Sequence, residues 1–269
     1  YRKDVPTIYS AAVSNSGTIA VSVVKSTSAS NGILQVYTVS EDGEILNQFD
    51  FTDEDKLVTS SMLYASSSGG FTMFVSFGSG ISDARLSTFS IFYTDSANGK
   101  DWGKLRGFAP SAGKKNPYTP FLAQYGGTDI VAFEAQEEQT EEQKGLNYPQ
   151  IFSSVRSGGE WGDVKLLTNA NTVIEKGSDY KFYKNYRPSI FSDGTSIKVA
   201  WERIVPDSAK ANIFVADLAR DGTVQDKESV VNLNDNTAVD ARRPLMFSYN
   251  GKVHCLWFDD SDRKSTRLN

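Results

Sequence analysis

Arginine and acidic side chains stand at corresponding places along this chain, next to short apolar stretches. Arg187 and Arg243 each come directly before a proline, whereas Glu134, Glu202 and Asp259 each close an apolar stretch. The planar fork of a guanidinium can grip both oxygens of a carboxylate. Two interpretations follow: the arginines bind an acidic ligand, or they pair internally with Glu202 and Asp259.

Other kinds of site find little support in the composition. His254 is the only histidine and Cys255 the only cysteine of the 269 residues, so we expect no Ser-His-Asp triad, no multi-histidine metal site and no internal disulfide. We expect no metal and no cofactor. The formal net charge is −5 and no basic block is present, which argues against a nucleic-acid partner. No run approaches the roughly 20 apolar residues of a membrane-spanning helix.

A unit of strand, glycine turn and strand recurs five times in the chain. The five copies begin at Pro6, Ser61, Pro120, Pro188 and Pro244. Their turn glycines are Gly17, Gly70, Gly127, Gly194 and Gly251, at separations of 53, 57, 67 and 57 residues. This regular spacing is typical of a repeat architecture.

A second strand pair lies between the copies and shares their period. Its turn glycines are Gly43, Gly99, Gly159 and Gly222, which are 56, 60 and 63 residues apart. Asp-Gly, Asn-Gly and Gly-Gly turns supply the positive φ angles that tight hairpins require. Each period is therefore predicted to carry four short antiparallel strands.

Four strands in a period of about 55–65 residues predict an all-β fold, a β-propeller with four-stranded antiparallel blades. Stacking blades around an axis protects the strand edges that a lone sheet would expose. Four blades and the first half of a fifth are visible, and we expect six in the complete ring. A β-sandwich is the alternative, but it gives no reason for the long period.

We predict a single propeller domain over residues 1–262. The tail 263-RKSTRLN-269 is basic and unpatterned, unlike the strand before it, and resembles a translated sequencing adaptor. We therefore interpret residues 263–269 as non-native, and expect the natural protein to continue past about Asp260.

The second hairpins resemble the Asp-box turn of sialidase-type propellers, Ser-x-Asp-x-Gly-x-Thr-Trp. In 94-TDSANGKDWGK-104, Gly99 and Trp102 match the box, and Ala97 takes the position of its aspartate. The stretches 157-SGGEWGDV-164 and 40-SEDGEIL-46 keep parts of the same turn. In that family the boxes are structural turns, so they report on fold and not on chemistry.

The opening YRKDVPTIYSAAVSNSGTIAVSVV resembles the first blade of a sialidase, in which an arginine lies two residues before a proline. Here Asp4 holds that position and Arg2 lies four residues before Pro6. In such a blade the innermost strand begins, and the second strand ends, on one face near the axis. That face collects the residues before each proline and those that close each second strand.

The resemblance implies sialidase chemistry at this face, and the candidate site residues are chosen by their shared face and their position in the repeat. Carboxylate-binding arginines would be Arg187, Arg243 and Arg2. The nucleophile would be Tyr186 or Tyr118, with Glu202 and Glu134 as partner carboxylates. Such a carboxylate would accept the phenol proton, since a tyrosine with a pKa near 10 is a weak nucleophile. Asp4 would be the acid/base that protonates the leaving oxygen.

Two function hypotheses follow. The first is a sialidase-like exo-glycosidase acting on sialylated or other acidic glycans. The second is a non-catalytic propeller of the same superfamily that serves as a surface module for binding or scaffolding. In both cases the expected partner is an acidic glycan or glycoconjugate, the protein is expected to be a monomer, and it would be secreted, periplasmic or at the cell surface.

Overall fold

The computed structural model describes residues 6–26, 32–51, 57–78, 89–136, 148–168, 173–176, 179–204, 208–226, 229–234 and 239–259. These residues form β-strands and one short 3-10 turn, Ala109–Ser111. Among them, no helix has the length and apolar character needed to cross a membrane. The chain divides into two compact units, Tyr1–Ala112 and Gly113–Asn269, and each is described by itself below.

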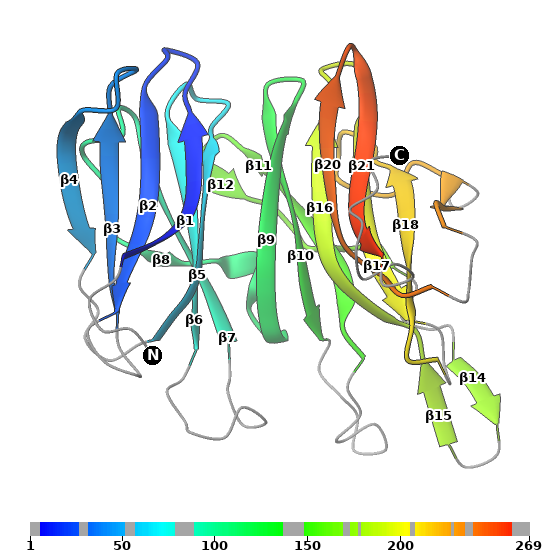
Figure 1. The fold of residues 1–269 in the computed structure, drawn as a ribbon. Helices are drawn as coiled ribbons and strands as arrows, with labels where there is room; N and C mark the ends of the chain where they lie inside the picture. The colour runs from blue at the N-terminus through cyan, green and yellow to red at the C-terminus, as the bar shows by residue number, and fades with distance from the viewer. Residues whose placement is uncertain are drawn as a thin grey trace. The chain divides into compact units, whose positions relative to one another are not determined.

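The first unit contains two four-stranded antiparallel sheets, each with its strands in chain order (Figure 1). The first sheet consists of β1 (Pro6–Val13), β2 (Ile19–Ser26), β3 (Gly32–Val39) and β4 (Ile45–Phe51). The second consists of β5 (Leu57–Ala65), β6 (Phe71–Gly78), β7 (Phe89–Ser96) and β8 (Arg106–Gly107).

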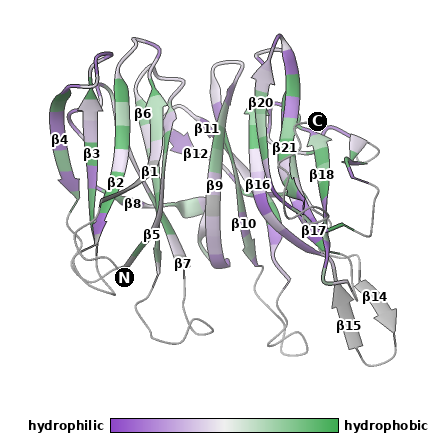
Figure 2. Ribbon diagram, viewed as in Figure 1, coloured by the Kyte–Doolittle hydropathy of each residue, from purple (hydrophilic) through white to green (hydrophobic). Residues whose placement is uncertain are grey.

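Burial in the first unit falls from the inner strands to the outer ones. All eight residues of β6 are buried, whereas β4 alternates between exposed and half-buried positions. A strand that is covered on both faces needs a continuous apolar run, whereas a half-exposed one needs only alternation. The hydropathy of the ribbon follows this difference, with β4 more hydrophilic than β2 (Figure 2).

The turn at 94–104 that resembles an Asp-box is held by Asn98. Its Oδ1 accepts the backbone N–H groups of Lys100 and Asp101 at 2.8 and 2.9 Å. The Trp102 indole N–H donates to the carbonyl oxygen of Gly99 at 2.9 Å. In an Asp-box the aspartate at the position of Ala97 would supply the side-chain oxygen that organises the turn. Here Asn98, the next residue, supplies it instead.

The second unit contains two complete sheets, one strand pair and one further hairpin. The first sheet consists of β9 (Lys115–Tyr125), β10 (Thr128–Gln136), β11 (Gln150–Ser157), β12 (Glu160–Trp161) and β13 (Lys165–Leu166), of which the last two both pair with β11. The next consists of β16 (Lys184–Ser192), β17 (Ile197–Ile204), β18 (Ala211–Asp217) and β19 (Val231–Asn232). The pair consists of β20 (Ala241–Tyr249) and β21 (Lys252–Asp259), and the hairpin of β14 (Val173–Lys176) and β15 (Asp179–Phe182).

The predicted organisation is confirmed in the described residues. They contain four sheets of at least four antiparallel strands and the first two strands of a fifth sheet. The sequence did not predict the β14–β15 hairpin, which falls outside the repeat. It also did not predict the register shifts in every inner strand pair, which number two in β9–β10 and one in each of the others. These shifts are β-bulges, which bend a strand and redirect its side chains.

Serine hydroxyls connect the inner strands of neighbouring sheets within each unit. The backbone N–H of Leu63 in β5 donates to the Ser10 hydroxyl in β1 at 3.0 Å. In the second unit, the N–H of Met246 in β20 donates to the Ser189 hydroxyl in β16, also at 3.0 Å. Each serine follows the bulge of its strand, so the bulge and the contact between sheets recur together.

Two turn glycines in the first unit provide a matched test of the packing around the second hairpins. Gly43 and Gly99 both have positive φ, at +85° and +76°, but a Cβ on Gly43 would meet no atom within 4 Å. A Cβ on Gly99 would lie 3.1 Å from the Phe71 ring. We expect Gly43→Ala to lower the free energy of unfolding by about 1–2 kcal/mol through backbone strain. Gly99→Ala should lower the free energy of unfolding by about 1–3 kcal/mol more than Gly43→Ala does, because overpacking adds to the backbone strain.

Urea denaturation of both variants, followed by circular dichroism, measures this difference. Equal losses of stability in the two variants would contradict the close packing of Gly99 against Phe71.

Candidate functional site

The second unit gathers most of the predicted site residues at one end of its inner strands. Tyr186 in β16 lies directly opposite Glu202 in β17, and Tyr118 in β9 lies opposite Glu134 in β10. Arg187 and Arg243 follow in the bulges of β16 and β20. The two remaining predicted residues, Asp4 and Arg2, lie outside the described residues.

Arg187 and Arg243 share a rare backbone conformation. Their φ angles are +47° and +55°, in the left-handed region that non-glycine residues seldom adopt. Each also precedes a proline, whose ring restricts the backbone of the residue before it. Such residues cost roughly 1–3 kcal/mol and persist only where their surroundings hold them. The bulges therefore need a specific interaction to keep them in place.

A glutamate from the preceding sheet supplies that interaction at both bulges. The backbone N–H of Arg187 donates to Glu134 Oε2 at 2.6 Å, and that of Arg243 donates to Glu202 Oε1 at 2.6 Å. Both glutamates lie near the end of the second strand of their sheet, so the contact repeats from one sheet to the next. A carboxylate is a stronger acceptor for a backbone N–H than a neutral oxygen.

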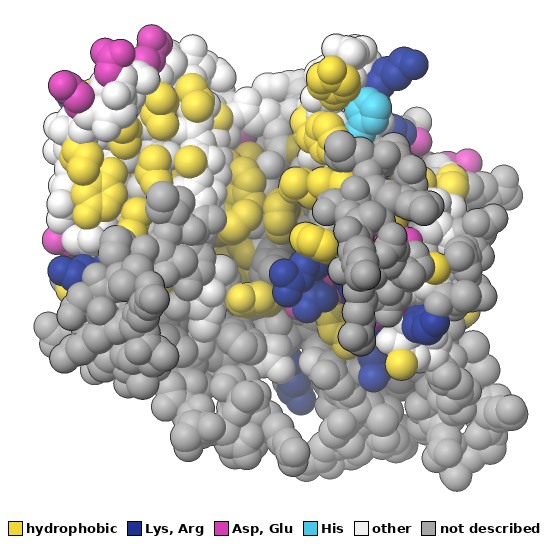
Figure 3. Space-filling model, viewed as in Figure 1, with side chains coloured by type: hydrophobic (Ala, Val, Ile, Leu, Met, Phe, Trp, Pro, Cys, Tyr) yellow, Lys and Arg dark blue, Asp and Glu magenta, His cyan; other side chains and the backbone are white. Residues whose placement is uncertain are grey.

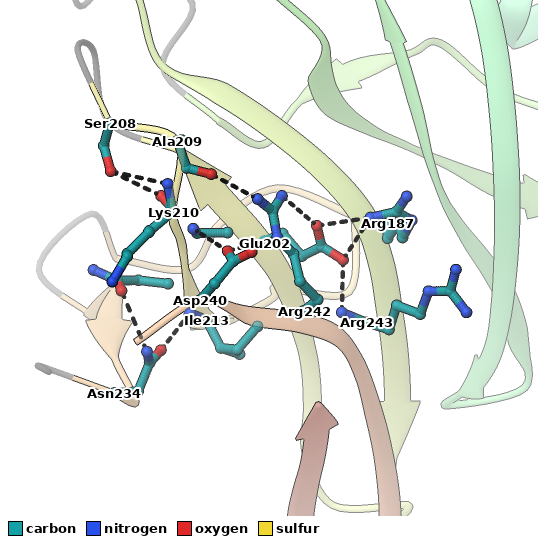
Figure 4. Close-up of polar contacts among 12 residues, drawn as sticks. Arg187, Glu202, Ser208, Ala209, Lys210, Ile213, Asn234, Asp240, Arg242 and Arg243 are labelled. Carbon is teal, nitrogen blue, oxygen red and sulfur yellow. Dashed lines mark hydrogen bonds and ion pairs between the residues drawn. The ribbon is translucent and has the colours of Figure 1, made fainter. Parts of the chain in front are cut away.

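Glu202 is the centre of the site, and its side chain is fully buried. Nη1 of Arg187 lies 3.0 and 2.9 Å from its two carboxylate oxygens, and Nη1 of Arg242 lies 3.4 Å from Oε2 (Figure 4). With the Arg243 N–H, three residues surround one carboxylate. A buried charge is tolerated only when it is paired and hydrogen-bonded in this way. Glu202 therefore orders the arginines and is not open to a ligand.

Arg242 belongs to the site, although sequence analysis assigned it no role. Its Nε donates to Asp240 Oδ1 at 2.6 Å, and its Nη2 donates to the Ala209 carbonyl at 2.9 Å. Asp240 also accepts the backbone N–H of Ala211 at 2.7 Å. The sequence contained one signal for this pair: Asp240 and Arg242 are two positions apart, and residues at that spacing share a face in an extended segment.

The guanidinium of Arg243 is different from those of its neighbours. It is exposed, and within the described part of the chain it makes no hydrogen bond or ion pair. In Figure 4 it extends away from Glu202, although its backbone N–H points to that carboxylate. Figure 3 shows Lys and Arg side chains grouped near the ends of β10 and β16. Arg187 is itself partly available, since 44% of its side chain is exposed.

Internal pairing, the alternative interpretation of these arginines, applies to only one of them. Arg187 forms the predicted ion pair with Glu202. The described residues provide no such pair between the Arg243 guanidinium and Asp259; it is Ala241 that lies opposite Asp259 in the strand register.

Tyr186 is half-buried beside these charges. Burial raises its pKa above the usual value of 10, the nearby Glu134 raises it further, and the charges of Arg242 and Arg187 oppose this only in part. A nucleophilic phenolate needs the opposite direction. In this arrangement Tyr186 is a neutral phenol that can donate a hydrogen bond.

A polar network supports the same strand pair from its other face. Asn185 is fully buried, and its Oδ1 accepts the Trp201 indole N–H at 2.9 Å and Nε of Arg203 at 3.0 Å. The Arg203 guanidinium lies 4.4 Å from the centre of the Phe214 ring. Burial lowers the pKa of Arg203. Because alternate residues of a strand face opposite sides, this network fixes the backbone that carries Tyr186 and Glu202.

The arrangement is suited to binding an anion. It offers one exposed guanidinium on a fixed backbone, a second that is partly exposed, and a phenol that can donate. Among the described residues, no group of three or more His, Cys, Asp or Glu side chains is placed to hold a metal ion.

Comparison with known proteins identifies the fold. No model of a protein family matches the sequence, and no curated protein matches it. Among solved structures, the Hadza microbial sialidase Hz136 has a TM-score of 0.59 at 9% identity, over 95% of this chain and 53% of that one. A protein of unknown function from Dyadobacter fermentans has a TM-score of 0.58 at 11% identity, over 96% and 76%. The endo-arabinase from Bacteroides thetaiotaomicron has 0.51 at 16% identity, over 96% and 89%.

These identities are too low to show more than a shared fold. Together with the sheets of antiparallel strands in chain order, they establish that the chain is a β-propeller. The chain spans about half the length of the sialidase that it resembles.

The buried carboxylate yields a direct prediction about stability. Glu202→Gln keeps the side-chain volume but removes the charge that Arg187 and Arg242 surround, and it turns an N–H group toward them. We expect the free energy of unfolding to fall by about 2–4 kcal/mol, near the cost of breaking a buried ion pair. Urea denaturation measures it, with the exposed Glu160→Gln as the control that should change little. A Glu202→Gln variant as stable as the wild type would contradict the central role of this carboxylate.

Proposed function

We propose that this propeller binds acidic glycans, and that Arg187 and Arg243 hold the carboxylate of the sugar. The exposed Arg243 guanidinium carries the proposal, because its backbone is fixed in a strained conformation while its charge is left without a partner in the described residues. Residues in such strained conformations cluster at functional positions.

The charge balance of the site supports an anionic ligand. Glu202 is already surrounded by Arg187, Arg242 and the Arg243 N–H, so it cannot also neutralise the Arg243 side chain. A ligand carboxylate at the Arg243 guanidinium would complete the pairing. A planar guanidinium can also hold it through two parallel hydrogen bonds, which adds orientation to affinity.

Hydrolysis is the second candidate, as in a sialidase-like exo-glycosidase; the register position of Tyr186 opposite Glu202 favours it, whereas its raised pKa opposes it. Tyr186 lies opposite Glu202 in the strand register and is close enough to Glu134 to feel its charge. In such a reaction Tyr186 or Tyr118 would be the nucleophile, and Glu134 would accept the phenol proton. Arg2 would add a third cation, and Asp4 would protonate the leaving oxygen. Glu202 would act as a positioning residue rather than as a base.

A protein that binds acidic glycans meets its ligands mainly outside the cell. We therefore propose that it is secreted, periplasmic or displayed at the cell surface, and that it works as a monomer.

Removal of the unpartnered guanidinium tests glycan binding. We expect sialyllactose to bind the wild type more tightly than neutral lactose, and Arg243→Met to weaken sialyllactose binding about 10- to 100-fold. That range corresponds to the roughly 1.5–3 kcal/mol of a hydrogen bond to a charged group. Isothermal titration calorimetry measures both ligands, and a fluorogenic sialoside assayed in parallel reports turnover.

Arg106→Met is the matched control, because Arg106 is a partly exposed arginine of the first unit that pairs with Asp95. Binding without turnover would support the glycan-binding module, and turnover lost in Arg243→Met would support the glycosidase. Equal affinity for sialyllactose and lactose would contradict the proposal, as would binding that survives Arg243→Met.

The pKa of Tyr186 separates the two candidates further. We expect the difference between the ultraviolet titrations of wild type and Tyr186→Phe to report a phenol that ionises above pH 10, because burial and Glu134 both disfavour the phenolate. Its stability contribution would then be intact below pH 10 and lost as the pH rises through the folded-state pKa. A phenol that ionises below pH 10 would instead indicate an activated nucleophile.

A further inference from the structure

A groove lies at the opposite end of β16 from Arg187, among three hairpin turns of the second unit. Its volume is about 430 Å³, within the usual size range of small-ligand sites. The residues that line it include Tyr125, Gly126, Gly194, Leu218, Arg220 and Gln225. Ser192, at the turn end of β16, lies five positions along the strand from Arg187, which is roughly 16 Å of extended chain. The groove is therefore distinct from the site at Arg187 and Arg243.

Arg220 gives the groove a positive charge without a counter-ion in the described residues. Its Nη2 donates to the carbonyl oxygen of Gly126 at 2.5 Å, which fixes the guanidinium against the neighbouring turn. This contact uses one of five N–H groups, and no carboxylate of the described residues forms an ion pair with it. A fixed and exposed guanidinium is well placed to grip a carboxylate.

Two acidic residues of these turns, Asp193 and Asp221, are committed elsewhere. Asp193 Oδ1 accepts the backbone N–H groups of Thr195 and Ser196 at 2.8 and 2.7 Å. Asp221, next to Arg220 in the chain, accepts the Thr223 N–H at 3.0 Å and its hydroxyl at 2.7 Å. Both carboxylates therefore stabilise their own turns.

The rest of the lining combines apolar and hydrogen-bonding surface. Tyr125 presents an aromatic side chain and donates from its hydroxyl to the Thr195 carbonyl at 3.1 Å, which holds the ring in place. Leu218 lies behind this lining and is buried. The side-chain amide of Gln225 makes no hydrogen bond with the described residues, although its backbone N–H donates to Asp217 at 2.9 Å. Apolar walls with a few convergent polar groups are typical of small-ligand sites.

Gly194 keeps the groove accessible. Its φ is +88°, and a Cβ there would meet no atom within 4 Å, so the turn borders open space. Gly126 is different, because a Cβ there would lie 3.2 Å from the Arg220 guanidinium. A side chain at Gly126 would therefore displace the arginine, which makes the close approach of Arg220 dependent on glycine.

We propose that this groove is a second saccharide site that takes a sugar ring bearing a carboxylate, such as a uronic acid. Arg220 binds the carboxylate, Gln225 binds ring hydroxyls, and the sugar ring packs on Tyr125. The inference does not rest on the function proposed for Arg187 and Arg243, since the two sites share no residue.

Titration of the ¹⁵N-labelled protein with D-glucuronate tests the proposal, with D-glucose and acetate as separate probes. We expect glucuronate to shift the backbone amides of Gly126, Gly194 and Leu218 saturably, with a dissociation constant in the millimolar range. Glucose and acetate should each bind at least tenfold more weakly than glucuronate, because glucose lacks the carboxylate and acetate lacks the sugar ring. Arg220→Met should weaken glucuronate at least tenfold, since it removes a charged hydrogen bond but keeps much of the side-chain stem.

Two further variants keep the result interpretable. Gln225→Leu should weaken glucuronate several-fold even if Arg220→Met proves unstable in a thermal melt, because the Gln225 side chain supports no other described contact. Arg243→Met should leave the shifts at Gly126 and Gly194 unchanged, which separates this groove from the first site. Any of three results would overturn the proposal: no saturable shift at these amides, equal binding of acetate or glucose, or glucuronate binding that survives Arg220→Met in a folded variant.

Discussion

The contacts of the buried Glu202 carboxylate are the interactions on which the arginine-rich end of the second unit depends. This carboxylate holds the Arg187 side chain from within its own sheet and the Arg243 backbone from the next sheet. Taking such a charge out of water is costly unless several partners surround it. The carboxylate therefore links two neighbouring sheets and organises the strained backbone that displays the arginines.

The same construction appears one sheet earlier, where Glu134 accepts the N–H of Arg187. A series of alternating glutamate and arginine thus runs from sheet to sheet: Glu134, Arg187, Glu202 and Arg243. The guanidinium of Arg243 makes no ion pair with the described residues.

Much of the fold was predictable because it depends on local chemistry that repeats. Turn glycines such as Gly43 and Gly99 take the positive φ that their spacing indicated, and the strands between them are the predicted ones. The bulges were not predictable, because arginine rarely adopts positive φ and nothing local requires it at Arg187 or Arg243. The β14–β15 hairpin was missed because it falls outside the period. A carboxylate that reaches across sheets becomes visible only once the sheets are placed.

Part of the candidate site was also predictable. The position of each residue in its repeat put Arg187 and Glu202 together at one end of the strands, and their ion pair was one of the two interpretations of the sequence. Sequence position did not distinguish Glu202, which is sealed by its partners, from a carboxylate open to substrate. That distinction depends on burial, which arises from packing against residues about 40 positions away, such as Arg242 and Arg243.

The backbone amide protons of Arg187 and Arg243 provide the most direct test of this account. Hydrogen bonds of 2.6 Å to carboxylates should move both amide protons downfield and protect them from exchange with solvent. In Glu202→Ala, the Arg243 amide should lose its downfield shift and protection, while the Arg187 amide, which is bound to Glu134, should keep its hydrogen bond. An Arg243 amide that exchanges freely in the wild type, or that is unchanged in Glu202→Ala, would contradict the account.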